Sequence, residues 1–311
     1  MRNTFTRCLE DYARAHEELV LVTGDLGFGV LFPYMKEFPD RFFNAGISEQ
    51  AMMSMAAGLA LEGHTVVVYS IGNFPTLRCL EQIRNCCAYH DANVKIVCVG
   101  AGFVYGVLGM THHATEDMSA LRLLPGVKVY APADAAETEA VMGPFLSEPG
   151  VAYLRIGRGG EACLHDAQAL KGYESGKAVP YADGTDAYIL TAGGVFPGAV
   201  DAAERLKAAG YSVGVASFPT VKPIDAAYIE QLCQKTQLLI TVEEHTIVGG
   251  FGSAVCEVVS GLADHRARVV RIGLNDTYCA TVGDQKYLEH EFGLDGEGVA
   301  ARALAVLEGR A

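Results

Sequence analysis

The sequence predicts an α/β protein with two three-layer α/β/α domains, each built on a mostly parallel sheet. Two observations support this: short, wholly apolar runs alternate with helical patterns along the chain, and Gly-rich or polar turns follow most of these runs. Strands that are apolar on both faces belong in a sheet covered by helices on both sides, the usual setting of parallel strands. A chain of 311 residues is long enough for two such domains.

The first domain is predicted over residues 1–165, and four apolar runs supply its strands. These runs cover residues 19–23, 65–69, 94–99 and 127–130. Two helices are predicted between them, over residues 48–61 and 135–145, and Asp134 is the expected N-cap of the second. Because ligands of open parallel sheets bind beyond the carboxyl ends of the strands, we expect the chemistry in the loops that follow these runs.

A polar stretch with no clear period separates the two domains, and we place the linker at residues 166–185. The second domain is then predicted over residues 186–311. Its expected elements are strands at residues 187–191, 212–216 and 237–242 and a helix at residues 200–209.

The formal net charge of −13 argues against a broad basic face, so neither nucleic acid nor an anionic membrane is an expected partner. An anionic substrate would have to be met by a few local arginines. The nine cysteines form no Cys-x-x-Cys pair, which is typical of reduced thiols. With no signal-peptide core and no apolar run of membrane-spanning length, we expect a soluble cytoplasmic protein.

Glu49 is the first candidate catalytic residue. Taken alone, it is an acidic residue in the first turn of a helix, where the helix dipole stabilises negative charge. Its surroundings change this interpretation, because Asn-Ala-Gly-Ile-Ser-Glu-Gln at residues 44–50 is followed by Ala-Ala-Gly-Leu-Ala at residues 56–60. The segment resembles the Gly-[Ile/Val]-x-Glu-[His/Gln] motif of transketolases and of the similar 1-deoxyxylulose-5-phosphate synthases.

In the transketolase family that glutamate hydrogen-bonds N1′ of the aminopyrimidine ring of thiamine diphosphate (ThDP). The resemblance therefore implies ThDP as the cofactor, with Glu49 exchanging a proton with the ring from a buried, largely apolar pocket. Thr-Gly-Asp-Leu at residues 23–26 is similar to a transketolase turn, which implies that Asp25 and Leu26 lie near the cofactor.

The segment from Tyr69 to Arg78 resembles the family segment whose aromatic side chain stacks on the pyrimidine. The resemblance gives that role to Phe74, with Arg78 and Gln82 as further cofactor neighbours. Judged without the resemblance, Phe74 fits core packing as well as it fits stacking.

Thr-His-His-Ala-Thr-Glu-Asp at residues 111–117 is a second strong match, since family members have Thr-His-[Gln/His] there. The resemblance implies that His112 is catalytic and faces the reacting carbon, where it stabilises a developing alkoxide or moves its proton. His113 is a second substrate contact or a solvated loop histidine. A metal site built from both histidines with Glu116 and Asp117 is the competing interpretation. Adjacent histidines point in different directions, so we predict no metal ligands in this chain.

Three arginines are candidates for binding a substrate phosphate. Arg155 and Arg158 end the last strand of the first domain, where the family has a phosphate-binding arginine, and a planar guanidinium suits bidentate anion contacts. Arg158 is the first choice, and a structural role is the alternative for Arg155. Arg2 is similar to another phosphate arginine of transketolases, or is a solvated charge near the terminus.

ThDP enzymes hold Mg²⁺ and the diphosphate with a Gly-Asp-Gly motif, which does not occur in this sequence. We therefore expect a separate, N-terminal-type transketolase subunit to hold both, in an α2β2 heterotetramer with each cofactor bound across a subunit boundary. The second domain resembles the family's C-terminal domain at residues 219–225, 243–245 and 249–252, and we expect it to serve assembly.

The expected reaction is transfer of a two-carbon ketol unit from a ketose or ketose phosphate to an aldehyde acceptor. The apolar loop at residues 106–110 replaces the acidic, Pro-containing loop by which transketolases recognise sugar hydroxyls, which points to a less hydroxylated acceptor. Three alternatives remain: the β subunit of a 2-oxoacid dehydrogenase, half of a 1-deoxyxylulose-5-phosphate synthase, and an inactive scaffold subunit. Glu49 together with His112 argues against the scaffold.

Overall fold

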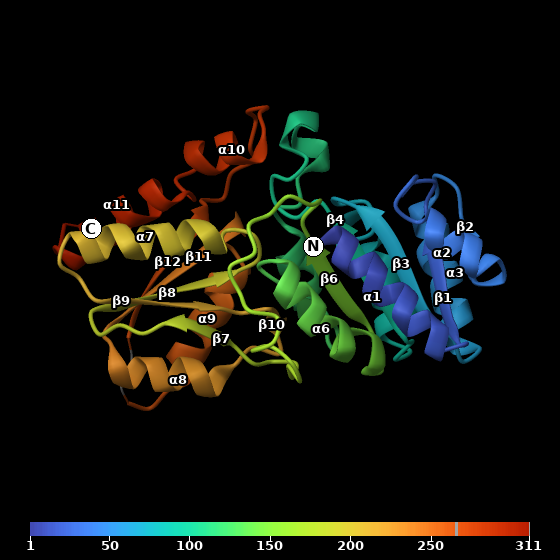
Figure 1. The fold of residues 1–311 in the computed structure, drawn as a ribbon, viewed down its shortest axis with the longest axis horizontal. Helices are drawn as coiled ribbons and strands as arrows, with labels where there is room; N and C mark the ends of the chain where they lie inside the picture. Colours follow the sequence, from blue (N-terminus) through green and yellow to red (C-terminus); the bar gives the residue numbers. More distant parts are fainter. Residues whose placement is uncertain (265–266, 311) are drawn as a thin grey trace.

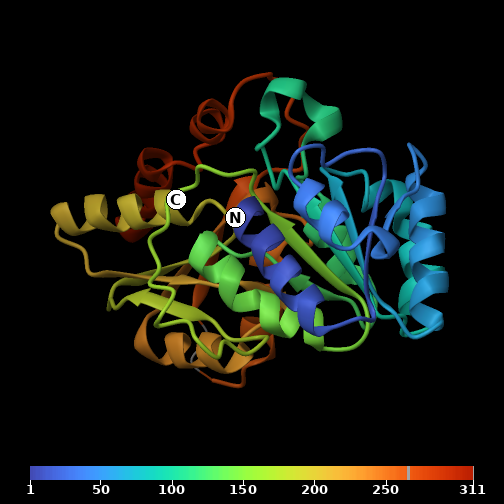
Figure 2. The ribbon, with the colours of Figure 1, turned by 45° about the vertical axis from the view of Figure 1, so that its right-hand side comes forward.

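The computed structural model describes residues 1–264 and 267–310, which form two sheets side by side, each between layers of helices (Figures 1 and 2). The strands of the first half are β1 (Leu19–Thr23), β2 (Phe42–Asn44), β3 (Thr65–Ile71), β4 (Val94–Val99), β5 (Lys128–Tyr130) and β6 (Ala152–Ile156). Its helices are α1 (Arg2–Ala15), α2 (Phe32–Glu37), α3 (Glu49–Leu61), α4 (Leu80–Gln82), α5 (Asp117–Leu123) and α6 (Ala135–Ser147). All predicted strands and helices of this half are confirmed, and Asp134 caps α6 by accepting the N–H of Glu137.

The second half adds β7 (Val179–Ala182), β8 (Ala187–Ala192), β9 (Val213–Ser217), β10 (Thr220–Lys222), β11 (Leu238–Thr246) and β12 (Arg268–Leu274). Its helices are α7 (Phe196–Ala208), α8 (Ala226–Lys235), α9 (Phe251–Gly261), α10 (Gln285–Glu291) and α11 (Gly296–Leu307). No helix in the described part of the chain is long and apolar enough to cross a bilayer.

The two sheets are mixed but mostly parallel, which confirms the predicted fold class. The first has seven strands in the order β10-β5-β6-β4-β3-β1-β2, and β10 is its antiparallel edge. The second has five strands in the order β12-β11-β8-β9-β7, and β7 is its antiparallel edge. Strand β7 lies inside the range expected to be linker, and β10 crosses from the second half of the chain to the first sheet.

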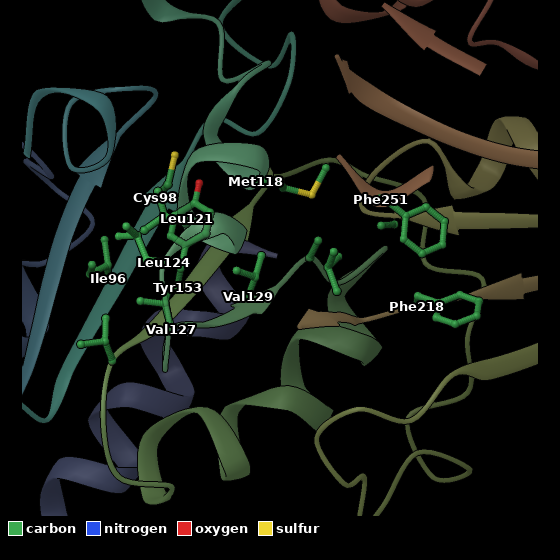
Figure 3. Packing of buried hydrophobic residues seen from close by; sticks show 14 of the residues in the cluster. Ile96, Cys98, Met118, Leu121, Leu124, Val127, Val129, Tyr153, Phe218 and Phe251 are labelled. Carbon is green, nitrogen blue, oxygen red and sulfur yellow. The ribbon is translucent and has the colours of Figure 1, made fainter. Parts of the chain in front are cut away.

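Three hydrophobic clusters hold the helices against the two sheets. One packs α1, α2 and α6 on one face of the first sheet, and another packs α7 and α11 on one face of the second. The third is shared: it runs from Ile96 and Met118 in the first half to Phe218 and Phe251 in the second (Figure 3). Because this cluster is continuous across the junction, apolar burial holds the two halves together.

The Glu-Glu-His and Gly-Gly-Phe-Gly segments of the second half are joined by hydrogen bonds. The buried carboxylate of Glu243 accepts the N–H groups of Phe251 and Gly252 at 2.7 and 2.9 Å, at the start of α9. A side chain at Gly252 would lie 2.5 Å from the Thr241 hydroxyl, so the position has room only for glycine. The family-like segments at residues 243–245 and 249–252 therefore serve to fix the N-terminus of α9 against the sheet.

A buried ion pair lies at the junction of the two sheets. Arg155 on β6 and Asp117 at the start of α5 are both fully enclosed, and Nε of Arg155 lies 2.9 Å from the carboxylate. Nη2 of Arg155 donates to the carbonyl oxygens of Ala114 and, across the junction, Glu244. One guanidinium therefore connects the first sheet, the loop before α5 and strand β11.

Replacing Asp117 with Asn should lower the free energy of unfolding by about 3 kcal/mol or more, because the buried charge of Arg155 then loses its counter-charge. Urea unfolding followed by circular dichroism measures this. The matched control is Asp11→Asn, which removes a solvent-exposed partner of Arg14 and should leave the unfolding midpoint nearly unchanged. Equal midpoints for the two variants would contradict a central role for the buried pair.

Candidate active site

The first sheet changes direction between β1 and β3: the chain leaves β1 for β2 on one side and then adds β3 on the other. Loops diverge at such a point and leave a crevice at the carboxyl ends of the strands. Three of the predicted segments meet there, one after β1, one after β2 at the start of α3, and one after β3. The fold thus brings Asp25, Glu49 and Phe74 to one edge of the sheet.

Glu49 is the first residue of α3 and is only 8% exposed. The buried side of the helix, Met52, Met53, Ala56 and Ala57, packs on the sheet and fixes the position of this first turn. The helix N-terminus favours a carboxylate there. Glu49 also lines an open depression of about 440 Å³, so its carboxyl group is enclosed by protein yet borders space that a ligand can enter.

Arg78 links two of the predicted cofactor contacts. Its Nη1 donates to Oε1 of Glu49 at 2.9 Å, and its guanidinium carbon lies 3.8 Å from the centre of the Phe74 ring. The side chain of Gln50 donates to the backbone carbonyl of Arg78 at 3.1 Å. A planar group carrying N–H donors therefore lies against an aromatic face and next to a carboxylate.

Asp25 follows β1 in a left-handed conformation, with φ of 56°, which Asp tolerates better than most residues. Asn44 holds it by two reciprocal hydrogen bonds, of 2.9 and 3.0 Å. Asn44 belongs to the predicted motif, where it had no assigned role, and its amide fixes the turn after β1.

The two other predicted cofactor neighbours are Leu26 and Gln82. Leu26 is half-buried and packs on the core cluster of α1 and α2. Gln82 in α4 has a buried Oε1 with no hydrogen-bond partner among the described residues.

The two adjacent histidines have different environments. His112 is half-buried, its ring centre lies 5.2 Å from that of Phe74, and its Nδ1 lies 3.1 Å from the Thr111 hydroxyl. His113 is 1% exposed and packs edge-on against Phe103, and burial lowers its pKa. The solvated alternative for His113 was therefore wrong, and only His112 faces the Phe74 side.

The metal alternative finds no support in this geometry. Asp117 is bound to Tyr153 and Arg155, and His113 is buried against Phe103, so these two side chains do not join His112 in a common ligand set. Within residues 1–264 and 267–310, no group of three His, Cys, Asp or Glu side chains is arranged to hold a metal ion.

Of the three candidate arginines, Arg2 and Arg158 lie near Tyr105, whereas Arg155 is buried elsewhere. Arg158 is exposed and lies 5.9 Å from the centre of the Tyr105 ring, and both Arg158 and Arg2 are close enough to lower the pKa of Tyr105 against the larger effect of burial. Arg155 is instead buried at the junction. Sequence reasoning missed Tyr105, for which the only signal was its place in the glycine-rich segment after β4.

Comparisons with known proteins identify the family of this chain. Residues 1–160 match the family model "Transketolase, pyrimidine binding domain", and residues 176–299 match "Transketolase, C-terminal domain". A transketolase C-terminal section of Methanocaldococcus jannaschii is 36% identical over 98% of this chain and 95% of its own length. One of the subunits of the apulose-4-phosphate transketolase of Phocaeicola vulgatus is 34% identical over 97% of this chain and 96% of its own length.

Longer relatives and a solved structure extend the comparison. The 1-deoxy-D-xylulose-5-phosphate synthase 1 of Geobacter sulfurreducens is 35% identical over 97% of this chain, which spans about half (47%) of that enzyme. A split-gene transketolase solved as an inactive β4 tetramer superposes with a TM-score of 0.88 at 32% identity, over 100% of this chain and 98% of the other. Family models, relatives and structure agree along the whole length: the chain belongs to the transketolase family and corresponds to the pyrimidine-binding and C-terminal domains of its members.

Proposed function

We propose that this chain is one subunit of a two-component, ThDP-dependent transketolase, in which Glu49 binds the aminopyrimidine ring. A partner subunit with the diphosphate-binding domain holds the diphosphate and Mg²⁺, in an α2β2 assembly in the cytoplasm. The arrangement of Glu49, Arg78 and Phe74 is the observation that carries this proposal. Bound ThDP supplies the carbanion chemistry of ketol transfer, and the protein supplies binding, orientation and proton movement.

The side chains of Glu49 and Phe74 are suited to bind the aminopyrimidine ring of ThDP. The guanidinium of Arg78 already makes the two contacts that an aminopyrimidine needs, one with the face of Phe74 and one with the carboxylate of Glu49. Arg78 is exposed, so it has room to move aside when the ring enters. The buried Oε1 of Gln82, which lacks a hydrogen-bond partner among the described residues, supports a further polar contact near this point.

His112 is positioned to act on the substrate. Its ring lies beside Phe74, and the contact of Nδ1 with Thr111 leaves Nε2 for a substrate oxygen. A histidine there can stabilise an alkoxide or carry its proton. Arg2 and Arg158, gathered around Tyr105, supply positive charge for a substrate phosphate, and the exposed Leu108 favours a less hydroxylated acceptor.

The surface around the site supports a partner subunit. Exposed apolar side chains lie in the segments that follow β1, β2, β3 and β4: Phe28 at 69%, Ile47 at 80%, Leu77 at 40%, Leu108 at 53% and Met110 at 47%. Apolar patches of this kind mark protein interfaces. The related split-gene transketolase is inactive as a tetramer of one subunit type, which is what an incomplete, shared site would produce.

Changing Glu49 to Gln in the assembled enzyme should lower kcat at least about a hundredfold, because an amide of the same shape cannot exchange a proton with the ring. Steady-state ketol-transfer assays at saturating ThDP measure this. The control is Glu62→Gln, an exposed residue at the opposite end of α3, which should retain full activity. Full activity of the Glu49 variant would instead favour the scaffold interpretation.

Replacing His112 with Gln should lower kcat about a hundredfold while leaving the ThDP dissociation constant within a factor of about three, because the ring acts on substrate rather than on cofactor. Kinetics and ThDP titration on the same preparation separate the two effects. His64→Gln, on the surface near the far end of α3, serves as control. Loss of ThDP affinity equal to the loss of kcat would contradict the assignment.

A second candidate function has one supporting observation. The identity to 1-deoxy-D-xylulose-5-phosphate synthases is as high as that to the transketolase subunits. Release of CO₂ from a 2-oxoacid by the assembled enzyme would favour this alternative, or the dehydrogenase β subunit. Transfer of a ketol unit without CO₂ release favours the transketolase.

A further inference from the structure

The second sheet has a direction change of its own. Strand β8 leads through α7 to β9 on one side, while β11 lies on the other side of β8. A cavity of about 460 Å³ lies beyond the carboxyl ends of β8 and β11, against the first domain. Its wall includes Arg155, Arg158, Gly193, Gly194, Glu244 and Gln285, whereas Glu49, Phe74 and His112 line no part of it. It is thus separate from the site proposed for the ThDP ring.

One wall of the cavity is the start of α7, a helix of 13 residues. The first N–H groups of a helix have no intrahelical acceptor, and the helix dipole adds a partial positive charge there. In α7, Pro197 has no N–H and the N–H of Phe196 bonds to the carbonyl of Gly193, so the dipole and the N–H groups beside these two residues are what an anion would meet. Gly193 turns the chain with φ of +81°, and a Cβ added at Gly194 would meet no atom closer than Nε2 of Gln285 at 3.9 Å. The backbone is therefore open to a ligand at the point where a helix favours an anion.

Arg155 supplies an independent observation. The residue is 1% exposed, and its Nε and Nη2 are bound to protein acceptors. Its Nη1 has no hydrogen-bond partner in the described parts of the chain, and it lies 3.4 Å from where a Cβ of Gly193 would be. Buried donors are normally satisfied by protein, water or ligand, so an unpaired guanidinium nitrogen at a cavity is available to an acceptor that enters it.

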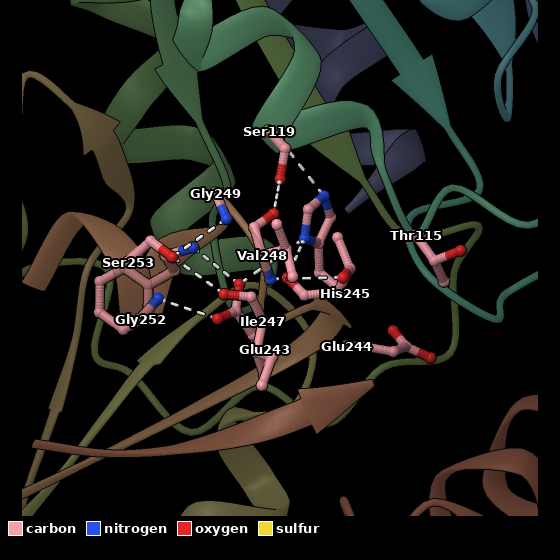
Figure 4. A network of polar contacts seen from close by, with 12 residues as sticks. Thr115, Ser119, Glu243, Glu244, His245, Ile247, Val248, Gly249, Gly252 and Ser253 are labelled. Atoms are coloured by element: carbon pink, nitrogen blue, oxygen red, sulfur yellow. Dashed lines mark hydrogen bonds and ion pairs between the residues drawn. The ribbon is translucent and has the colours of Figure 1, made fainter. Parts of the chain in front are cut away.

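The wall carries side chains of both charges. Arg158 and the exposed Lys286 add positive charge, and the carboxylate of Glu161 is paired with the terminal amino group of Met1. Burial raises the pKa of Glu244, which weakens the negative charge of that carboxyl. In Figure 4, Glu244 points away from the polar cluster around Glu243, on the side opposite α9.

Glu289 is the remaining acidic residue in the wall, and burial raises its pKa as well. Because Arg155 is paired with Asp117, Arg158 and Lys286 are the basic side chains that add positive charge to the wall. Gln285 of α10 lies opposite the start of α7, with its Nε2 3.9 Å from where a Cβ of Gly194 would be.

We propose that this cavity binds a phosphate monoester of sugar-phosphate size, with its phosphate between the start of α7 and Nη1 of Arg155. The volume is in the range of small-molecule sites. A guanidinium together with a glycine-rich helix start is a combination suited to phosphate. The site is distinct from the one proposed for the ThDP ring, although it shares Arg158 with the proposed substrate phosphate contacts, and a ligand there would bridge the two domains.

The test is calorimetric titration of the full chain, without ThDP or a partner, using inorganic phosphate and fructose 6-phosphate as probes. Gly194→Asp and Gly194→Asn form a matched pair, since they add side chains of equal size that differ only in charge. We expect fructose 6-phosphate to bind the Asn variant at least about tenfold more tightly than the Asp variant, because the carboxylate repels the phosphate. Inorganic phosphate should show the same order.

Equal affinities of the two variants, or no binding by the unmodified chain, would overturn the proposal. Binding that is lost in Arg158→Gln but equal in the two Gly194 variants would place the ligand at the substrate arginines instead, and would also overturn it. Should Gly194→Asp fail to fold by circular dichroism, Lys286→Glu on the exposed side of α10 replaces it, with Lys286→Gln as its control. The Glu variant is then expected to bind more weakly.

Discussion

A single buried guanidinium, that of Arg155, connects the parts of this molecule on which the rest depends. Its ion pair with Asp117 fixes the start of α5, and its bond to the carbonyl of Glu244 fixes β11 against the first sheet. Taking two charges out of water is costly unless they are paired and hydrogen-bonded, and the partners of this pair come from both halves of the chain. Its third nitrogen is left to face the interdomain cavity.

The two sheets share one topological feature but carry different residues at it. Each parallel sheet has a direction change, and each direction change leaves a crevice at the carboxyl ends of the strands. In the first half the crevice carries a buried glutamate beside an aromatic ring, which suits a flat, basic heterocycle. In the second it carries a helix start and a guanidinium, which suits an anion. The same topology thus leaves two crevices lined by chemically different residues.

Much of the fold was readable from the sequence, because strands buried on both faces must be continuously apolar. The position of Glu49 followed from a motif at a helix start. What could not be predicted were features set by distant parts of the chain: the edge strands β7 and β10, the burial of His113, and the partners of Arg155 at the junction, for which a structural role was only one alternative. Tyr105 was missed for the same reason, since only the folded chain brings Arg2 and Arg158 to it.

The most direct measurement of the central claim is calorimetric titration of ThDP with Mg²⁺ into this chain alone and into its complex with a diphosphate-binding subunit. We expect no measurable binding to the chain alone and tight, Mg²⁺-dependent binding to the complex, since in the proposed assembly the ring and the diphosphate are held by different chains. Tight, Mg²⁺-dependent binding by the isolated chain would contradict it.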